Sequence, residues 1–229
     1  MTLAVPFPFA PVTRTWSTVL FDLDGTLVHS APAIVDGLAF VHRELGLPIP
    51  PEPELLDWIG PPVLESLRER AGLSELEALR ARDAYREYAD AAEQHVALFP
   101  GILGVLEQLS EANIPIAVAT SKPELAAERL LQRLGIRDLF HTCVGANDAV
   151  GRNRKADVVG EALLRLAALG VDIEGPVMVG DRGHDVVGAA EHDVPTILVE
   201  WGYGHPREAQ DALAVVASAD QLRKLLLTG

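Results

Sequence analysis

The sequence of 229 residues is poor in cysteine and in positive charge, and it has no long apolar run. With Cys143 as the single cysteine, no internal disulfide can form, and a reducing compartment is expected. The apolar runs fall far short of the roughly 20 residues that a membrane-spanning helix needs, so we expect no membrane partner. Lysine and arginine number 19 against 33 aspartates and glutamates, a net charge of -14, and this excess of acid argues against a nucleic-acid partner.

The N-terminal segment lacks the pattern of a secretory signal. It is apolar, but it contains three prolines and no basic residue before Arg14. We therefore expect residues 1–16 to form a flexible tail and the protein to be cytoplasmic. The rest of the chain has the composition of a folded domain, since 48% of all residues are hydrophobic and 23% are charged.

Short apolar runs alternate with amphipathic segments along most of the chain, and this alternation predicts an α/β fold. We expect a Rossmann-like parallel sheet flanked by helices, with strands at residues 18–21, 116–119, 176–179 and 196–199. Helices are predicted where apolar residues recur at helical spacing, and Gly46 and Gly135 are the expected stops of two of them.

Residues 31–97 interrupt this alternation, because they contain helical patterns and no convincing strand. One helix should begin after Ser74, since Glu77 stands three residues later and can complete a capping box. In an open parallel sheet, ligands bind at the carboxyl ends of the strands, and the insertion follows the first strand directly. We therefore expect a catalytic core of residues 17–30 and 98–229, with an all-helical cap domain of residues 31–97 over the site.

Two aspartates, Asp22 and Asp24, stand where the first apolar strand ends in a glycine turn. Paired acids at the end of a buried strand usually need a cation, although an acidic turn capped by Asp24 is the simpler alternative. A calcium loop of the EF-hand type is excluded, because Leu27 and Ala33 occupy the positions that require Gly and Glu.

Three further motifs follow in order, and together with the first they resemble those of the haloacid dehalogenase-like hydrolases. They are a strand that ends in Thr120 and Ser121, a lone lysine at Lys155, and a second acidic turn that contains Asp181 and Asp185. The length of the insertion and the segment of residues 200–204 are most similar to the phosphoglycolate phosphatase-like branch. The resemblance runs from about Thr18 to the C-terminus, and it implies a phosphatase that uses an aspartyl-phosphate.

Mg²⁺ is the cofactor expected for this chemistry, because it prefers oxygen ligands and screens the repulsion between a carboxylate and a phosphate dianion. Asp22 and Asp181 are its natural carboxylate ligands, and the resemblance implies that Asp24 adds its backbone carbonyl. Asp185 would orient water or the lysine without binding the metal.

The resemblance also assigns the catalytic roles. Asp22 would attack phosphorus, and Asp24 would protonate the leaving oxygen and then take a proton from water. Lys155 would neutralise charge on the transferred group, and Gly25, Asp24, Thr120 and Ser121 would help to bind the phosphate. A capping box of Ser121 and Glu124 predicts a helix right after Thr120, whose first amides would face that phosphate.

Several readings of the function stay open at this point. The favoured substrate is a small phosphorylated metabolite of the phosphoglycolate, sugar phosphate or nucleotide type, and the protein is expected to be a monomer or homodimer. A phosphomutase similar to β-phosphoglucomutase would use the same motifs but return the phosphoryl group to a sugar. A dehalogenase is less favoured, because that chemistry uses the first aspartate without Mg²⁺. A catalytically idle binding or regulatory module is the alternative of another class.

Overall fold

The apolar runs predicted from the sequence come together as neighbours in one parallel sheet. The computed structural model describes residues 16–228, and its main sheet has the order β5-β4-β1-β6-β7-β8. The predicted strands form its centre, while β5 and β8 lie outside the four predicted runs and occupy its two edges. The bounds are β1 (Thr18–Phe21), β4 (Ile116–Pro123), β5 (Thr142–Ala146), β6 (Pro176–Gly180), β7 (Thr196–Val199) and β8 (Ala214–Val216).

Strand β1 is the middle of the core, because β4 and β6 pair with it on either side. Its side chains alternate between the two faces of the sheet. Val19 and Phe21 belong to one buried cluster, and Leu20 belongs to the other. Both faces of β1 are therefore buried, as expected for a parallel sheet covered by helices.

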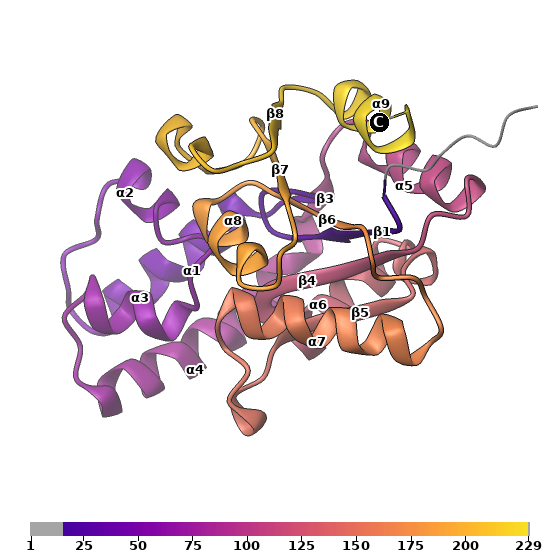
Figure 1. Ribbon diagram of the computed structural model, residues 1–229. Helices are drawn as coiled ribbons and strands as arrows, with labels where there is room; N and C mark the ends of the chain where they lie inside the picture. Colours follow the sequence, from indigo (N-terminus) through magenta and orange to yellow (C-terminus); the bar gives the residue numbers. More distant parts are fainter. Residues whose placement is uncertain (1–15, 229) are drawn as a thin grey trace, which may run out of the picture.

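Helices cover both faces of the sheet (Figure 1). One layer is formed by α7 (Lys155–Ala168) and α8 (Gly183–Ala190), which pack on β4 to β7. On the opposite face, the buried cluster includes side chains of α5 (Ile102–Glu111), α6 (Glu124–Arg133) and α9 (Ala219–Thr228) packed against the strands. Short 3-10 helices complete the connections: η1 (Glu93–His95), η2 (Arg137–Leu139), η3 (Asp148–Val150) and η4 (Pro206–Ala209).

A helical insertion separates two short antiparallel strands, β2 (Val28–His29) and β3 (Ala97–Leu98). It comprises α1 (Ala31–Glu44), α2 (Glu52–Leu56), α3 (Val63–Glu69) and α4 (Glu75–Ala92), which form a separate group at the left of Figure 1. The insertion has its own apolar cluster, which includes Leu38, Leu55, Trp58 and Leu67. As predicted, α4 begins after Ser74, whose backbone N–H donates to the Glu77 carboxylate at 3.0 Å.

The predicted helix start after Thr120 is wrong. Strand β4 continues in extended conformation to Pro123, which pairs with Ala146, and α6 begins only at Glu124. The Glu124 carboxylate does not cap the helix, because it binds Arg152 at 2.5 Å and accepts the Gly145 N–H at 3.3 Å. Cations and an amide from neighbouring elements thus outcompete the local capping box.

Most of the predicted N-terminal tail lies outside the described residues. Of residues 1–16, Trp16 alone is described, and it is half-buried, with its indole N–H donating to the Leu225 carbonyl at 3.4 Å. None of the helices within residues 16–228 is long and apolar enough to cross a membrane.

Candidate active site

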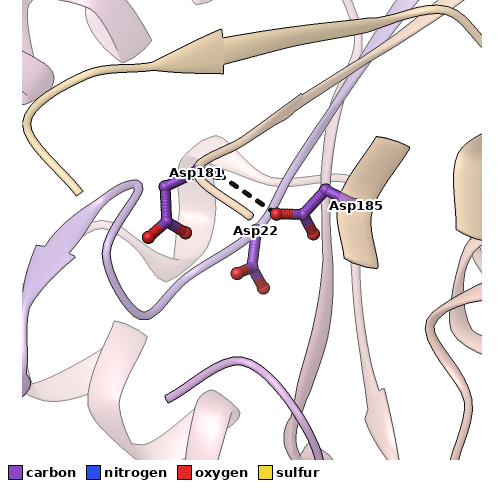
Figure 2. Close-up of side chains that lie close together, drawn as sticks. All are labelled: Asp22, Asp181 and Asp185. Carbon is purple, nitrogen blue, oxygen red and sulfur yellow. Dashed lines mark hydrogen bonds between the residues drawn. The ribbon is translucent and has the colours of Figure 1, made fainter. Parts of the chain in front are cut away.

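Three aspartates from two distant segments of the chain meet at the carboxyl end of the sheet (Figure 2). Asp22 follows β1, Asp181 follows β6, and Asp185 lies in the first turn of α8. Their residues are 5%, 2% and 1% exposed, and one carboxylate oxygen of each lies within 4.8 Å of the others. The fold thus concentrates three carboxylates where water cannot easily solvate them.

Lys155, at the first position of α7, is the lysine that the sequence analysis predicted for the site, and it lies among these acids. Its Nζ lies 2.8 Å from Asp22 Oδ1 and 2.8 Å from Asp185 Oδ1, and it donates to the Ala119 carbonyl at 3.1 Å. Burial by itself would lower the pKa of Lys155. The negative charges of Asp185 and Asp22 raise this pKa by more than burial lowers it, so the net shift is upward. The lysine therefore keeps its charge, and one positive charge faces three carboxylates.

The negative charge that Lys155 does not balance changes the pKa values of the aspartates. Burial, followed by the charges of Asp185 and Asp22, holds the pKa of Asp181 well above its usual range. Burial likewise raises the pKa of Asp185, although Lys155 opposes this shift. Buried carboxylates that share a site in this way are a fitting set of ligands for a hard divalent cation, which would relieve their repulsion.

Backbone amides fix two of the carboxylates in place. Asp185 Oδ2 accepts the N–H groups of Asp181 and Arg182, at 3.1 and 3.0 Å. Asp181 Oδ2 accepts the Tyr203 N–H at 2.7 Å, and its Oδ1 lies 3.3 Å from the Thr26 hydroxyl. The role of Tyr203 was not predicted, because a backbone donor has no side-chain signature. The role of the Thr26 hydroxyl was not predicted either, because it depends on a contact between segments far apart in the chain.

Gly202 is required by this arrangement, since a Cβ at its position would lie 2.2 Å from the Cβ of Asp181. The absence of a side chain lets the loop after β7 pass against Asp181 and deliver the Tyr203 amide. The two glycines of residues 200–204 are a sequence signal that could have indicated such a close approach.

Gly202→Ala is expected to displace the Asp181 carboxylate and to lower kcat by about 100-fold, because a shift of about 1 Å at a reacting centre has that cost. The measurement is kcat with a simple aryl phosphate. Gly104→Ala is the matched control, because Gly104 lies in α5 with open space where the methyl group would sit, and it should keep full activity. Equal activity of both variants would contradict the role of Gly202.

Asp24 and Thr120 lie beside the aspartate cluster and open onto a cavity of about 100 Å³. Asp24 Oδ1 is buried without a partner among the described residues, and its Oδ2 lies 3.8 Å from Lys122 Nζ. The Thr120 hydroxyl accepts the Lys122 N–H at 3.2 Å. The cavity is also lined by Asp22 and Ser121. The predicted motif at Asp22 and Asp24 and the predicted motif at Thr120 and Ser121 therefore line the same cavity.

The helical insertion forms the opposite wall and is held to the core by polar contacts. The Arg182 guanidinium donates to the Ile59 carbonyl of the insertion, and His205 Nε2 lies 2.7 Å from Asp57 Oδ1. Gly60 and Pro61, which follow Ile59, line the cavity next to Asp22 and Asp24. Arg182 neighbours Asp181, so one residue links the acidic cluster to the insertion, a link that sequence reasoning missed.

Lys122 is a second residue that sequence reasoning left without a role. Its Nζ lies 2.5 Å from Glu93 Oε1, which belongs to η1 at the end of the insertion. Burial alone would lower the pKa of Lys122, but Asp24 and Glu93 raise it, and the net shift is upward. Lys122 is therefore a charged lysine already engaged by two carboxylates.

Comparisons with known proteins agree with this geometry. The sequence pattern of the haloacid dehalogenase-like hydrolase family matches residues 19–199. A tyrosine-protein kinase PtkA of Mycobacterium tuberculosis is 40% identical over 213 residues, which are 91% of this chain and 72% of PtkA. A phosphoglycolate phosphatase of Caulobacter vibrioides is 31% identical over 220 residues, 93% of this chain and 91% of that protein. The crystal structure of a predicted phosphatase from Clostridium acetobutylicum is 30% identical, with a TM-score of 0.85, covering 92% of this chain and 98% of that one.

Proposed function

Since the chain belongs to the haloacid dehalogenase-like hydrolases, we propose that it is a magnesium-dependent phosphatase of a small organic phosphate monoester. The observation that carries the proposal is the buried cluster of Asp22, Asp181 and Asp185, with Lys155 between two of them, next to a cavity. We also propose residues 31–97 as a cap over a core of residues 17–30 and 98–229, since the insertion lines that cavity.

Asp22 is the proposed nucleophile. Its Oδ1 is held by Lys155, which leaves Oδ2 to attack phosphorus. As the new P–Oδ2 bond forms, the bond from phosphorus to the ester oxygen breaks, and Asp24 gives its proton to the departing oxygen. Water then attacks the aspartyl-phosphate and passes a proton to Asp24, and breakage of the P–Oδ2 bond releases orthophosphate and restores Asp22.

The phosphate would be held by charge and by donors around Asp22. Lys155 supplies a fixed positive charge, since its Nζ is already positioned by the Ala119 carbonyl and by Asp185. The hydroxyls of Thr120 and Ser121 are proposed as further phosphate donors. Because these groups are in place before the substrate binds, they would stabilise the transferred group without rearranging. The expectation that the Gly25 N–H also binds the phosphate is not supported, because this N–H donates to the Val28 carbonyl at 3.0 Å.

The residues present fit Mg²⁺, which we propose is held by the carboxylates of Asp22 and Asp181 and the backbone carbonyl of Asp24, while Asp185 orients these groups from behind. When bound, the ion supplies positive charge that screens the repulsion between Asp22 and the phosphate dianion. The gathering of three buried carboxylates within 4.8 Å of one another supports this fit, because burial and then neighbouring negative charge raise the pKa values of Asp181 and Asp185, and a divalent cation would oppose both effects.

Magnesium is expected to stabilise the folded protein as well as to support turnover. At about 100 times its dissociation constant a ligand adds about 2.7 kcal/mol, which corresponds to a rise in Tm of about 5–10 °C for a chain of this size. Asp181→Asn should lose most of this rise, whereas Asp172→Asn, in an exposed turn, should keep it. Differential scanning calorimetry with and without MgCl₂ at matched ionic strength measures both, and an equal rise in the two variants would contradict the proposed ligand set.

The direct test of the function is release of phosphate from p-nitrophenyl phosphate with and without Mg²⁺. The proposal predicts turnover that needs the ion and is lost in Asp22→Asn. If neither this compound nor a broad panel of phosphate monoesters is hydrolysed, the catalytically idle binding or regulatory module becomes the better description.

Two other phosphoryl-transfer reactions differ from hydrolysis in the group that accepts the phosphoryl group. A phosphomutase would convert a hexose 1-phosphate into an isomeric sugar phosphate without free orthophosphate. The name of PtkA suggests a protein tyrosine as acceptor and a nucleoside triphosphate as donor. Incubation of a tyrosine peptide with ATP and Mg²⁺ should leave the peptide unmodified by mass spectrometry if water is the acceptor.

A further inference from the structure

We infer that the substrate's leaving group is uncharged and mainly apolar, and this inference rests on the proposed phosphatase function. It concerns the part of the cavity that lies beyond the reacting groups. There the insertion contributes a mostly apolar wall, formed by Ile34, Leu38, Trp58, Ile59, Val63 and Ala89. An apolar leaving group would bury its surface against this wall and gain binding energy as water leaves.

The cations at the cavity already have carboxylate partners. Of the described residues that line it, two are cationic, Lys122 and Arg86. Lys122 Nζ lies 2.5 Å from Glu93 and 3.8 Å from Asp24, and both carboxylates line the same cavity. Arg86 NH2 lies 3.2 Å from Asp148 of the core, a carboxylate that also pairs with Arg82 at 3.0 Å. A carboxylate or second phosphate on the leaving group would therefore have to lose its water and compete with carboxylates that already bind both cations.

The neighbouring polar cleft does not supply such a charge either. It is lined by Arg154 and Lys155 together with Glu65 and Glu191. Arg154 pairs with Glu191, and Lys155 is bound to Asp22 and Asp185. An anionic group that reached into this cleft would thus meet paired cations and two carboxylates.

The polar groups that remain suit a neutral acceptor. The indole N–H of Trp58 and the Nε–H of Arg86 are buried and have no acceptor among the described residues. Tyr85, also at the cavity, stays a neutral phenol because burial raises its pKa far above the ordinary value. A hydroxyl or ether oxygen of the leaving group can accept from these N–H donors without bringing a charge into the mostly apolar cavity. The inferred substrate class is therefore an aryl phosphate or another monoester of a neutral alcohol, and 2-phosphoglycolate, with its carboxylate, is expected to be poor.

The test compares two substrates that differ by one carboxylate, phenyl phosphate and 4-carboxyphenyl phosphate. We expect kcat/KM to favour phenyl phosphate by about 10-fold or more, because the charged ring would be desolvated in a mostly apolar cavity whose cations are already ion-paired. Glu93→Gln frees Lys122 from its closest carboxylate and should reduce this preference several-fold. Glu87→Gln, on the exposed side of α4, is the matched control and should leave the preference unchanged.

The possible outcomes distinguish a failure of the inferred leaving-group preference from a failure of the proposed phosphatase function. Equal kcat/KM values, or a preference for 4-carboxyphenyl phosphate or 2-phosphoglycolate, would overturn the inference while the phosphatase function stands. A preference that Glu93→Gln leaves unchanged would overturn the part assigned to Glu93 and Lys122. If none of these esters is hydrolysed with Mg²⁺ present, the proposed function fails and the inference fails with it. The substrate comparison uses the wild-type protein, so it is decisive even if Glu93→Gln does not fold.

Discussion

Asp22→Asn is expected to lower kcat by about 10⁴-fold or more, because the amide cannot attack phosphorus and removal of a nucleophile has effects of this size. The fold should persist, since the new amide side chain keeps an oxygen for Lys155, and Lys155 keeps its contacts with Asp185 and Ala119. The measurements are kcat with p-nitrophenyl phosphate and Tm by calorimetry.

The matched control is Asp36→Asn, which makes the same chemical change at an exposed position of α1. It should have wild-type kcat and Tm. If Asp22→Asn kept about a tenth of the wild-type activity, Asp22 could not be the nucleophile, because such a loss is small for a reacting group.

Lys155→Met is expected to have the largest effect on stability as well as a large effect on rate. It leaves Asp22 and Asp185 buried without their cation, and loss of one partner from a buried ion pair costs about 3–5 kcal/mol. It also removes a fixed charge from the reacting group, which should lower kcat by about 10³-fold. Urea unfolding without Mg²⁺ measures the first effect, and steady-state kinetics with Mg²⁺ measures the second.

Lys224→Met is the control for this variant, because the chain has three lysines and Lys224 pairs with Asp220 on the surface. An exposed pair contributes little, so the control should change the free energy of unfolding by less than about 1 kcal/mol. Mg²⁺ should restore part of the stability lost in Lys155→Met, because it brings positive charge back to the same carboxylates. A stability loss as small as that of the control would contradict the assigned role of Lys155.

The sequence predicted the parts of the site that depend on strand ends. Asp22 and Asp181 each follow a buried apolar run, and parallel strands end at the same edge of a sheet, so their approach followed from local patterns. Lys155 could be placed there by its match to the third motif. The edge strand β8 was harder to find, because it has three residues, partly exposed, and lacks a long apolar run.

The sequence could not predict the contacts that depend on how the insertion meets the core. The pairing of Lys122 with Glu93 and the bond from Arg182 to the Ile59 carbonyl join segments far apart in the chain. Neither contact leaves a periodic pattern, and a carbonyl acceptor has no side-chain signature. The Ser121 capping box failed for a related reason, since Arg152 binds the carboxylate of Glu124 from elsewhere in the fold.

The central claim is that Asp22, one member of a buried carboxylate cluster, is transiently phosphorylated with the help of a divalent ion. Rapid acid quench during turnover of phenyl phosphate, followed by peptide mass spectrometry, tests it directly. The account predicts a phosphoryl adduct on the peptide that contains Asp22, localised to that residue, present with Mg²⁺ and absent after EDTA treatment. Turnover with the adduct on another residue, or an adduct that forms equally well in EDTA, would contradict it.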